Sequence, residues 1–316
     1  MLHLRVISPV ELTDDVLELL EHEAGATHLT LDRGAALAPP GDVVQADVAR
    51  ECANSLLDAL TDLGVERDGG VTLETIDTTL SMSARRAEKE APGDPSDAVI
   101  WEELIARTGE ESQLTWTYAS FQVLSVLIAA VGVVTNSPVT VVGAMVIGPE
   151  FGPLAAIAVN LVRRRTELIR RSLLAVGVGF PLAMVITLVG ALVAEAFGLV
   201  TDRSLDSASQ VSFIYQVGPF SFVVSLLAGA AGMLSLVSAK SAALVGVFIS
   251  VTTVPAAGYA VVAATLGQWG KAGESALQLG VNLVGITVAA TVLLAVLHRR
   301  RSRARDRNEA EAPDAG

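Results

Sequence analysis

The sequence predicts an all-α membrane domain of six transmembrane helices, arranged as two inverted three-helix repeats, preceded by an α+β ferredoxin-like (βαββαβ) soluble domain. The first observation is composition: 51% of the 316 residues are hydrophobic and mean hydropathy is +0.52, which is too apolar for an ordinary soluble protein. The second is charge, because residues 1–113 contain 24 acidic and 8 basic side chains, whereas the remaining chain contains 10 and 14. We therefore expect two domains in two environments.

Residues 1–80 are predicted to form the soluble domain, on the cytoplasmic side. Alternating apolar and polar residues predict strands, and apolar residues at helical spacing predict helices, in the order β-α-β-β-α-β. The strands are expected at residues 2–7, 27–31, 42–48 and 71–76, and the helices after Thr13 and over residues 50–63, each ended by a glycine.

This domain shows no chemistry that the sequence alone supports. His3, His22 and His28 lack the spacing of metal ligands and are interpreted as surface or loop side chains. Cys52 lies near a helix start, where a thiol pKa can fall, but a buried structural cysteine is the simpler interpretation. The chain has no enzyme signature and no cofactor or metal motif. The acidic domain would repel phosphates, so nucleic-acid binding is not expected.

A polar linker is expected over residues 81–113. It contains the turn sequence APGDP at residues 91–95. Residues 98–107 carry apolar side chains at helical spacing, including Trp101. Two interpretations stay open for this helix: it lies in the membrane interface, or it is a short connecting helix packed on the soluble domain.

The membrane domain is assigned to residues 114–298. Six apolar segments there are each long enough to cross a hydrocarbon core about 30 Å thick. They lie at residues 114–134, 138–162, 168–197, 218–238, 241–265 and 274–298. Trp116 and Tyr118 lie at the first boundary, where aromatic side chains commonly mark the membrane interface.

Arginine and lysine residues predict the orientation of these segments. Arginines cluster after the second and sixth segments and Lys240 follows the fourth, whereas the opposite loops contain few charges. Positive residues favour the cytoplasmic side, so both termini are predicted to be cytoplasmic. The absence of a recognisable signal peptide agrees with this orientation. The tail, residues 299–316, is expected to be basic and then disordered.

The second apolar segment contains an unusual concentration of glycine and proline, in the stretch NSPVTVVGAMVIGPEFGP at residues 136–153. Such residues break or kink a helix. Backbone groups freed by a break inside a membrane must be satisfied by protein or by water in a cavity. The residues expected to break helices here and in the fifth segment are Gly143, Gly148, Pro153 and Gly246.

Glu150, within this stretch, is the leading candidate for a functional residue. An unpaired carboxylate in a membrane costs several kcal/mol, so it must be protonated, paired or hydrated. We expect it to bind a proton or cation near the midplane; the alternative is an anchor between helices or a shallower position. The predicted ion- or substrate-binding residues are Glu150, Asn136, Pro149, Gly152, Thr252, Thr253 and Pro255. Asn160 and Asn282 are expected to form hydrogen bonds between helices.

The first three segments resemble the last three. Ser125, Leu127, Ala130 and Gly132 align with Ser225, Leu227, Ala230 and Gly232, Gly143 aligns with Gly246, and the break at residues 149–153 corresponds to Pro255. Because three crossings are an odd number, the second copy enters the membrane from the opposite side, as in many secondary transporters. Two broken segments are therefore expected to meet at one interior point.

Residues 115–265 resemble the bacterial and archaeal uncharacterised hydrophobic domain family, domain of unknown function 389. The resemblance is carried by NSPVTVVGAMVIGPEFGP, by the later SAALVGVFISVTTVPAAG, and by a G-A-M-x-I/V-x-P-x-x-G-P signature at residues 143–153. It implies a multi-pass protein of a prokaryotic plasma membrane, often with a soluble N-terminal region, and no established activity. Many members have a neutral residue where Glu150 stands, which makes the carboxylate a trait of a subgroup.

The sequence favours a transporter or channel for an ion or small solute in the lipid bilayer. The soluble domain would regulate transport or mediate homo-oligomerisation. The alternative is a non-transporting scaffold or sensor in which the soluble domain binds a ligand or partner. A simple anchor would not need breaks at matching places in two repeats, so transport is preferred. A polar cavity that reaches Glu150 from one face would distinguish the two.

Overall fold

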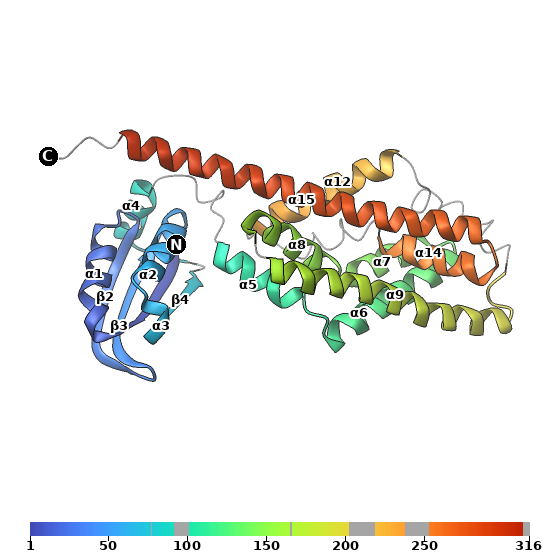
Figure 1. Cartoon of the computed structure of the whole chain (residues 1–316), viewed down its shortest axis with the longest axis horizontal. Helices are drawn as coiled ribbons and strands as arrows, with labels where there is room; N and C mark the ends of the chain where they lie inside the picture. Colours follow the sequence, from blue (N-terminus) through green and yellow to red (C-terminus); the bar gives the residue numbers. More distant parts are fainter. Residues whose placement is uncertain (77, 92–100, 165, 202–218, 238–252, 312–316) are drawn as a thin grey trace. The chain divides into compact units, whose positions relative to one another are not determined.

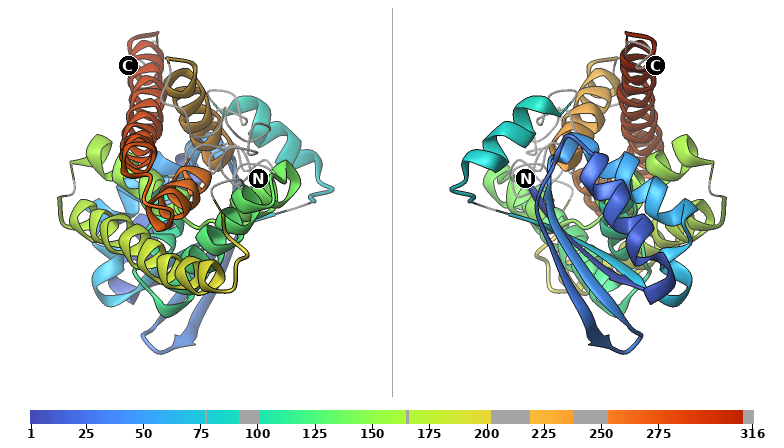
Figure 2. Two further views of the ribbon diagram at one scale, coloured as in Figure 1. Left: turned by 90° about the vertical axis from the view of Figure 1, so that its right-hand side faces the viewer. Right: turned by 90° about the vertical axis from the view of Figure 1, so that its left-hand side faces the viewer.

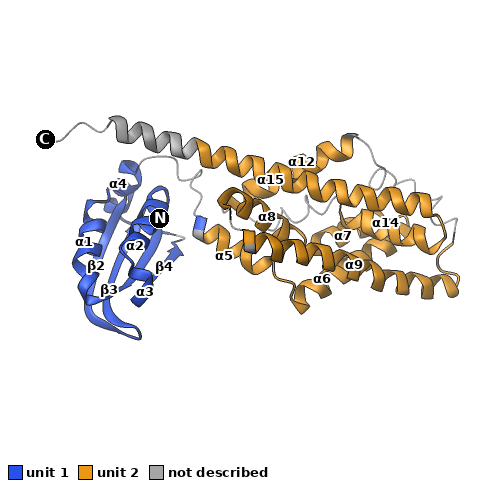
Figure 3. Ribbon diagram, in the orientation of Figure 1, with its two compact units in different colours: residues 1–101, 304–316 blue, residues 102–303 orange. Residues whose placement is uncertain are grey.

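The computed structural model describes residues 1–76, 78–91, 101–164, 166–201, 219–237 and 253–311. The chain forms two compact units (Figure 3). The first contains Met1–Trp101 together with the chain from Ala304 on, and the second contains Glu102–Arg303. The division after Trp101 falls inside the expected linker.

The N-terminal unit contains a four-stranded sheet with helices between its strands. In chain order the elements are β1 (Leu2–Ser8), η1 (Val10–Leu12), α1 (Thr13–His22), β2 (Ala26–Leu37), β3 (Pro40–Val48), η2 (Arg50–Cys52), α2 (Ala53–Asp62), α3 (Val65–Asp68) and β4 (Gly70–Thr75). The strand order is β2-β3-β1-β4, and each neighbouring pair is antiparallel. All four strands lie where alternation predicts them. β2 is longer than expected, because its pairing with β3 continues to Leu37 and Pro40.

The core of this unit lies between one face of the sheet and the helices α1 and α2 (Figure 2). Alternate strand residues such as Leu4 and Val44 are fully buried there, together with Leu56 of α2. Cys52 joins this core. Burial, reinforced by the hydrogen bond and charge of Glu23, raises the pKa of its thiol to about 12. These observations favour the structural interpretation of Cys52 over a reactive thiol.

The expected linker contains a helix that the sequence analysis did not predict, α4 (Met82–Glu90). The Ser81 hydroxyl caps it by accepting a hydrogen bond from the amide of Ala84, and Ala84 and Ala87 are buried against the unit. The helix was overlooked because charged residues dominate its sequence. Its buried face consists only of small alanines at helical spacing, which give a weak apolar signal.

The helix expected at residues 98–107 begins at Trp101 and ends at Glu111 (α5); residues 98–100 lie outside the described part of the chain. Trp101 is buried, and its backbone amide donates a 3.1 Å hydrogen bond to Oδ1 of Asn54 in the N-terminal unit. The first residue of α5 is therefore packed on protein.

The second unit consists of helices (Figure 1). They are α6 (Trp116–Val134), α7 (Pro138–Ile147), α8 (Phe151–Arg163), α9 (Thr166–Ala196), α12 (Pro219–Val237), α14 (Val254–Thr265) and α15 (Trp269–Glu311). Among the described residues, α6, α9, α12 and α15 are long and apolar enough to cross a membrane. The pair α7 and α8, bent by 51°, brings the number to five.

The fifth predicted segment and the tail agree only in part with the described structure. Of the predicted fifth segment, only α14 is described and it has 12 residues; residues 241–252 lie outside the described residues. The described residues therefore contain four or five candidate spans, and a sixth stays a prediction. α15 runs through the basic part of the expected tail and ends at Glu311. Arginine, alanine and glutamate all favour helix, which accounts for the extension.

The distribution of polar and apolar side chains in this unit is the reverse of that in a soluble protein. Large apolar side chains are exposed on its long helices, for example Val131, Val185 and Leu227. Polar side chains are buried inside: Gln122, Ser125, Glu150, Asn160, Thr187, Thr253, Ser275, Gln278 and Asn282. An exposed apolar surface of this extent is stable in contact with lipid, so we conclude that the helical unit is embedded in a membrane.

α14 is enclosed by neighbouring helices of this unit. Its residues from Val254 to Val262 are all buried, and it packs against α6 and α9 (Figure 2). The close approach to α6 depends on Gly258, since a Cβ atom there would lie only 2.9 Å from both the Cβ of Ala129 and the amide nitrogen of Ala130. Small residues allow such close helix packing in membranes.

Candidate functional site

The break in the second segment is narrower than expected. Gly148 ends α7 with an extended ψ of 124°, Pro149 follows, and Glu150 occupies the N-cap position of α8. Gly143 lies inside α7 and Pro153 inside the first turn of α8, so neither belongs to the break itself. A single glycine is tolerated within a helix, and proline in a first turn removes only an amide that has no helical partner. Gly246 lies outside the described residues.

A second short helix begins at the same interior point. Thr253 is the N-cap residue of α14, and Pro255 follows in its first turn, as Pro153 does in α8. Both helices are buried around almost their whole circumference, including Ala155–Val159 of α8. Helices that are apolar on every side are stable only when enclosed by protein or lipid. Figure 1 shows α8 and α14 toward opposite ends of the helical unit.

The two N-cap residues are joined by a hydrogen bond. Oγ1 of Thr253 donates to Oε1 of Glu150 over 2.7 Å, and both residues have 0% exposure. The N-terminus of a helix carries a partial positive charge of about half an elementary charge, from its unpaired backbone amides. A carboxylate at the start of α8 that is also bound to the start of α14 therefore lies where negative charge is stabilised.

The other predicted site residues fall into two groups. Pro149 and Gly152 flank Glu150 in the chain, and Pro255 lies two residues after Thr253, so these residues lie around the junction. Asn136 does not join them: it forms the turn between α6 and α7, with a φ of 48°. Thr252 lies outside the described residues.

A cavity of about 330 Å³ reaches this junction. Its wall includes Gly148 and Pro149 on one side of Glu150 in the chain, and Phe151 and Gly152 on the other. The remaining wall comes from the end of α5, the start of α6 and the end of α12, all within the helical unit. The fully buried side chain of Glu150 is not itself part of this wall.

Tyr118 lines the cavity, although the sequence analysis assigned it to the membrane interface with Trp116. Trp116 is 88% exposed as expected, but Tyr118 is 5% exposed. Its ring packs on Gly179 of α9, where a Cβ atom would lie 2.8 Å from the ring. Because Gly179 has no side chain, it leaves room for the ring of Tyr118 to lie inside the unit. The polar spacing of Tyr118, Gln122 and Ser125 along one face of α6 was the signal that could have revealed this.

Glu111, at the end of α5, was also overlooked as a candidate. It lines the cavity, and one of its carboxylate oxygens lies 3.0 Å from the position that a Cβ atom on Gly152 would take. Burial raises the pKa of Glu111 and the charge of Glu110 adds to this effect, whereas Arg107, 3.9 Å away, opposes it. A carboxyl group thus lies beside the first turn of α8.

The two asparagines expected to link helices behave differently. Oδ1 of Asn282 on α15 accepts hydrogen bonds from Ser221 on α12, over 3.4 Å, and from Gln278, over 3.3 Å. The first of these does join two helices. Asn160 instead donates to the carbonyl oxygen of Ala156 in its own helix, over 2.7 Å.

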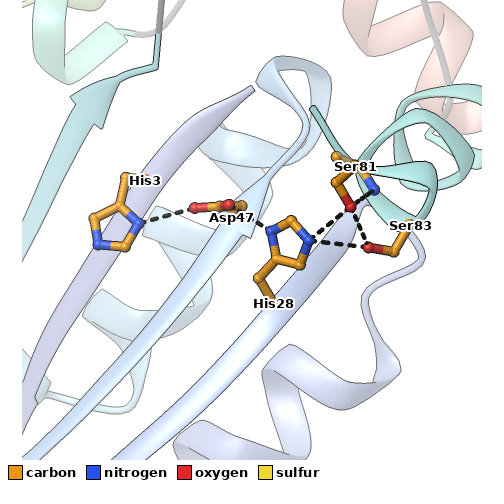
Figure 4. A network of polar contacts seen from close by, with 6 residues as sticks. His3, His28, Asp47, Ser81 and Ser83 are labelled. Atoms are coloured by element: carbon orange, nitrogen blue, oxygen red, sulfur yellow. Dashed lines mark hydrogen bonds and ion pairs between the residues drawn. The ribbon is translucent and has the colours of Figure 1, made fainter. Parts of the chain in front are cut away.

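The N-terminal unit contains a separate polar network, shown in Figure 4. The carboxylate of Asp47 contacts Nδ1 of His3 at 2.8 Å and Nδ1 of His28 at 2.7 Å. Nε2 of His28 contacts the hydroxyls of Ser81, at 2.8 Å, and Ser83, at 3.0 Å, at the start of α4. Burial opposes ionisation of Asp47, but the hydrogen bonds with His28 and His3 prevail and lower its pKa. These two histidines are therefore more than isolated surface side chains.

Comparisons with known proteins show that part of the helical unit resembles a family of unknown function. Residues 145–288 match the family model described as "Domain of unknown function (DUF389)". This confirms the resemblance predicted from the signature, and the matched segment contains both Glu150 and Thr253. A curated relative, the uncharacterized protein MJ0678 of Methanocaldococcus jannaschii, is 22% identical over 228 residues, which cover 72% of this chain and 69% of that protein. No solved structure matches the chain significantly.

Proposed function

We propose that this membrane protein is a transporter or channel for an ion or small solute, with Glu150 and Thr253 at its central site. The observation that carries the proposal is the 2.7 Å hydrogen bond between these residues, each at the N-terminus of a short buried helix. Secondary transporters commonly bind ions and substrates at broken helices near the middle of the membrane. A helical anchor has no need of a buried carboxylate, which is costly in such a place.

An inverted repeat is part of this proposal. Glu150 and Thr253 are 103 residues apart. Gly143 and Gly246, which align in the sequence, have the same separation (246 − 143 = 103). Glu150 and Thr253 are thus counterparts under that alignment, and the contact between counterparts is what two inverted repeats around a shared centre would produce. The proposal includes six crossings, the fifth formed by residues 241–265.

The proposal also assigns an orientation and a role to the N-terminal unit. The arginines that follow α8 and those at residues 299–307, in the last turns of α15, favour cytoplasmic termini in a prokaryotic plasma membrane. The strand order β2-β3-β1-β4, with helices after β1 and β3, supports a ferredoxin-like domain. We propose that this domain regulates the membrane unit or pairs with copies of itself in a homo-oligomer.

The second candidate is a sensor that does not transport, in which the N-terminal unit binds a ligand or partner. It is favoured by the network in which His28 joins Asp47 of the sheet to Ser81 and Ser83 of α4, since α4 begins the segment that leads to the membrane unit. A ligand that displaced α4 would have a direct covalent path to the membrane. This candidate predicts no flux through the protein.

Flux measurements separate the two candidates. The purified full chain is reconstituted into liposomes, and the movement of protons, sodium, potassium, chloride and phosphate is compared with that in liposomes without protein. A transporter or channel raises at least one of these fluxes well above the protein-free rate. If every flux equals the protein-free rate over a range of pH and membrane potential, the sensor becomes the better account.

A further inference from the structure

The cavity beside the junction has a position that suits an access route. Gly148 and Pro149, and then Phe151 and Gly152, line it. Only Glu150 separates these two stretches, and this fully buried residue turns its side chain toward Thr253. At about 30 Å³ per molecule, the volume of about 330 Å³ holds on the order of ten waters.

Buried polar groups on α6 indicate that water enters this region. Tyr118 lines the cavity, and its hydroxyl is buried with no hydrogen-bond partner among the described residues. One turn further, neither amide atom of the fully buried Gln122 has a partner in that part of the chain. Proteins seldom leave such groups unpaired, so ordered water is the expected partner.

The cavity also has an acidic end. Glu110 and Glu111 line it together with Arg107, all from the last turns of α5. The pKa of Glu111 is raised, chiefly by burial, so this carboxyl group takes up a proton more readily than an ordinary glutamate. Carboxyl and phenol groups therefore follow one another from the end of α5 to the junction.

We propose that this cavity is the water-filled route by which protons exchange between one side of the membrane and the carboxyl group of Glu150. The inference rests on the proposed function, since it takes Glu150 as the working site, and it names the proton as the ion that the site binds. Glu111 receives protons at the acidic end, and water held by Tyr118 carries them to the junction. The lining of the cavity includes carboxyl and hydroxyl groups, which can hold water and pass protons.

Cysteine labelling tests whether the cavity is wet. The chain contains one cysteine, Cys52, which is buried with a thiol pKa of about 12, so the wild type provides a nearly unreactive background. In the full chain in liposomes, the Ser235→Cys variant places a thiol in the cavity wall and the Val185→Cys variant places one on the exposed apolar face of α9. A charged, water-soluble methanethiosulfonate reagent should label the first at least tenfold faster. Equal, slow labelling of both would overturn the proposal.

Infrared spectroscopy tests whether protons use the cavity. The band of the protonated carboxyl group of Glu150, assigned by its loss in Glu150→Gln, is followed in the full chain after transfer to heavy water at a pH low enough for this group to be protonated. Attaching the reagent to the Ser235→Cys variant fills the cavity and should slow hydrogen–deuterium exchange of this band at least tenfold. Labelling a matched site outside the cavity should leave the exchange unchanged. Exchange that is equally fast with the cavity filled would contradict the proposed route.

The result is distinguishable from a failure of the proposed function. Labelling and carboxyl exchange do not require transport, so both outcomes can be positive in a protein that moves no ion. Conversely, the flux can depend on Glu150 while hydrogen–deuterium exchange of its carboxyl group is unchanged in the filled cavity. That result would support the transporter and contradict this proton route. A Glu111→Gln variant should slow the exchange, whereas Glu195→Gln, near the end of α9, should not.

Discussion

The hydroxyl of Thr253 donates a 2.7 Å hydrogen bond to the carboxylate of Glu150, and neither side chain is exposed. The two residues are far apart in the chain but occupy the same position in their helices, the N-cap. Two helix starts and one carboxylate therefore stabilise one another. Removing the hydroxyl leaves the carboxylate with fewer compensating interactions in a buried place.

Thr253→Val should destabilise the helical unit. Valine keeps the shape of threonine but cannot donate a hydrogen bond, and the loss at a buried charged partner costs about 1–3 kcal/mol. The measurement is the thermal unfolding midpoint of the full chain in one detergent. Thr253→Ser, which retains the hydroxyl, is the control and should lie closer to wild type. Equal midpoints for the valine variant and wild type would show that the hydrogen bond contributes little.

Alanine substitutions at two glycines should have opposite effects. At Gly258 the new Cβ atom would lie 2.9 Å from α6, which is too close, and overpacking of this kind costs about 1–3 kcal/mol. At Gly177 in α9 nothing lies within 4 Å, so alanine should stabilise the helix by about 0.5–1 kcal/mol. Unfolding midpoints measured side by side test both. A Gly258→Ala protein as stable as wild type would contradict the close packing of α14 on α6.

Cys52 should resist thiol reagents until the N-terminal unit unfolds. Its pKa is raised from 9.0 to about 12, so the fold favours the neutral thiol. The associated stability is complete below pH 9.0 and is lost between pH 9.0 and about 12, where the unfolded chain releases the proton and the folded chain does not. A chromogenic disulfide reagent measures the reaction, with the denatured chain as the positive control. Rapid reaction of the native protein at neutral pH would place Cys52 outside the core.

Asp47→Asn should loosen α4. The carboxylate holds His28, which contacts Ser81 and Ser83 at the start of that helix. Because the pKa of Asp47 is lowered from 3.8, its stabilising effect is present above pH 3.8 and is lost as the pH falls through the lower folded value. Amide hydrogen exchange over Met82–Glu90 in the full chain should be faster in the variant. Asp32→Asn, an exposed aspartate on β2, is the control; equal acceleration by both would indicate a general charge effect.

Periodicity predicted most of the fold, because its signal is local. The four strands and the long helices α6, α9 and α15 follow directly from the spacing of apolar residues. α4 was not predicted, since its buried face is only Ala84 and Ala87, and side chains that small barely alter the pattern. This helix depends on packing against the sheet, and such packing cannot be read from the sequence.

The candidate site was predicted in part for the same reason. Glu150 and the helix start near Thr253 were recognised because charge, glycine and proline are conspicuous in apolar segments. Tyr118 was misplaced, since an aromatic residue near a boundary is usual at the interface, and only the neighbouring Gly179 explains why its ring turns inward. Glu111 was overlooked because its approach to Gly152 joins two elements through tertiary structure alone.

The most direct test of the central claim is the flux of the Glu150→Gln variant in liposomes, measured against pH beside the wild type. Glutamine is close in size and can still accept the hydrogen bond from Thr253, so the fold should persist, but it cannot bind or release a proton. We expect the flux to fall at least tenfold or to lose its dependence on pH. Flux of unchanged size with an unchanged pH profile would show that Glu150 is not the working residue of this protein.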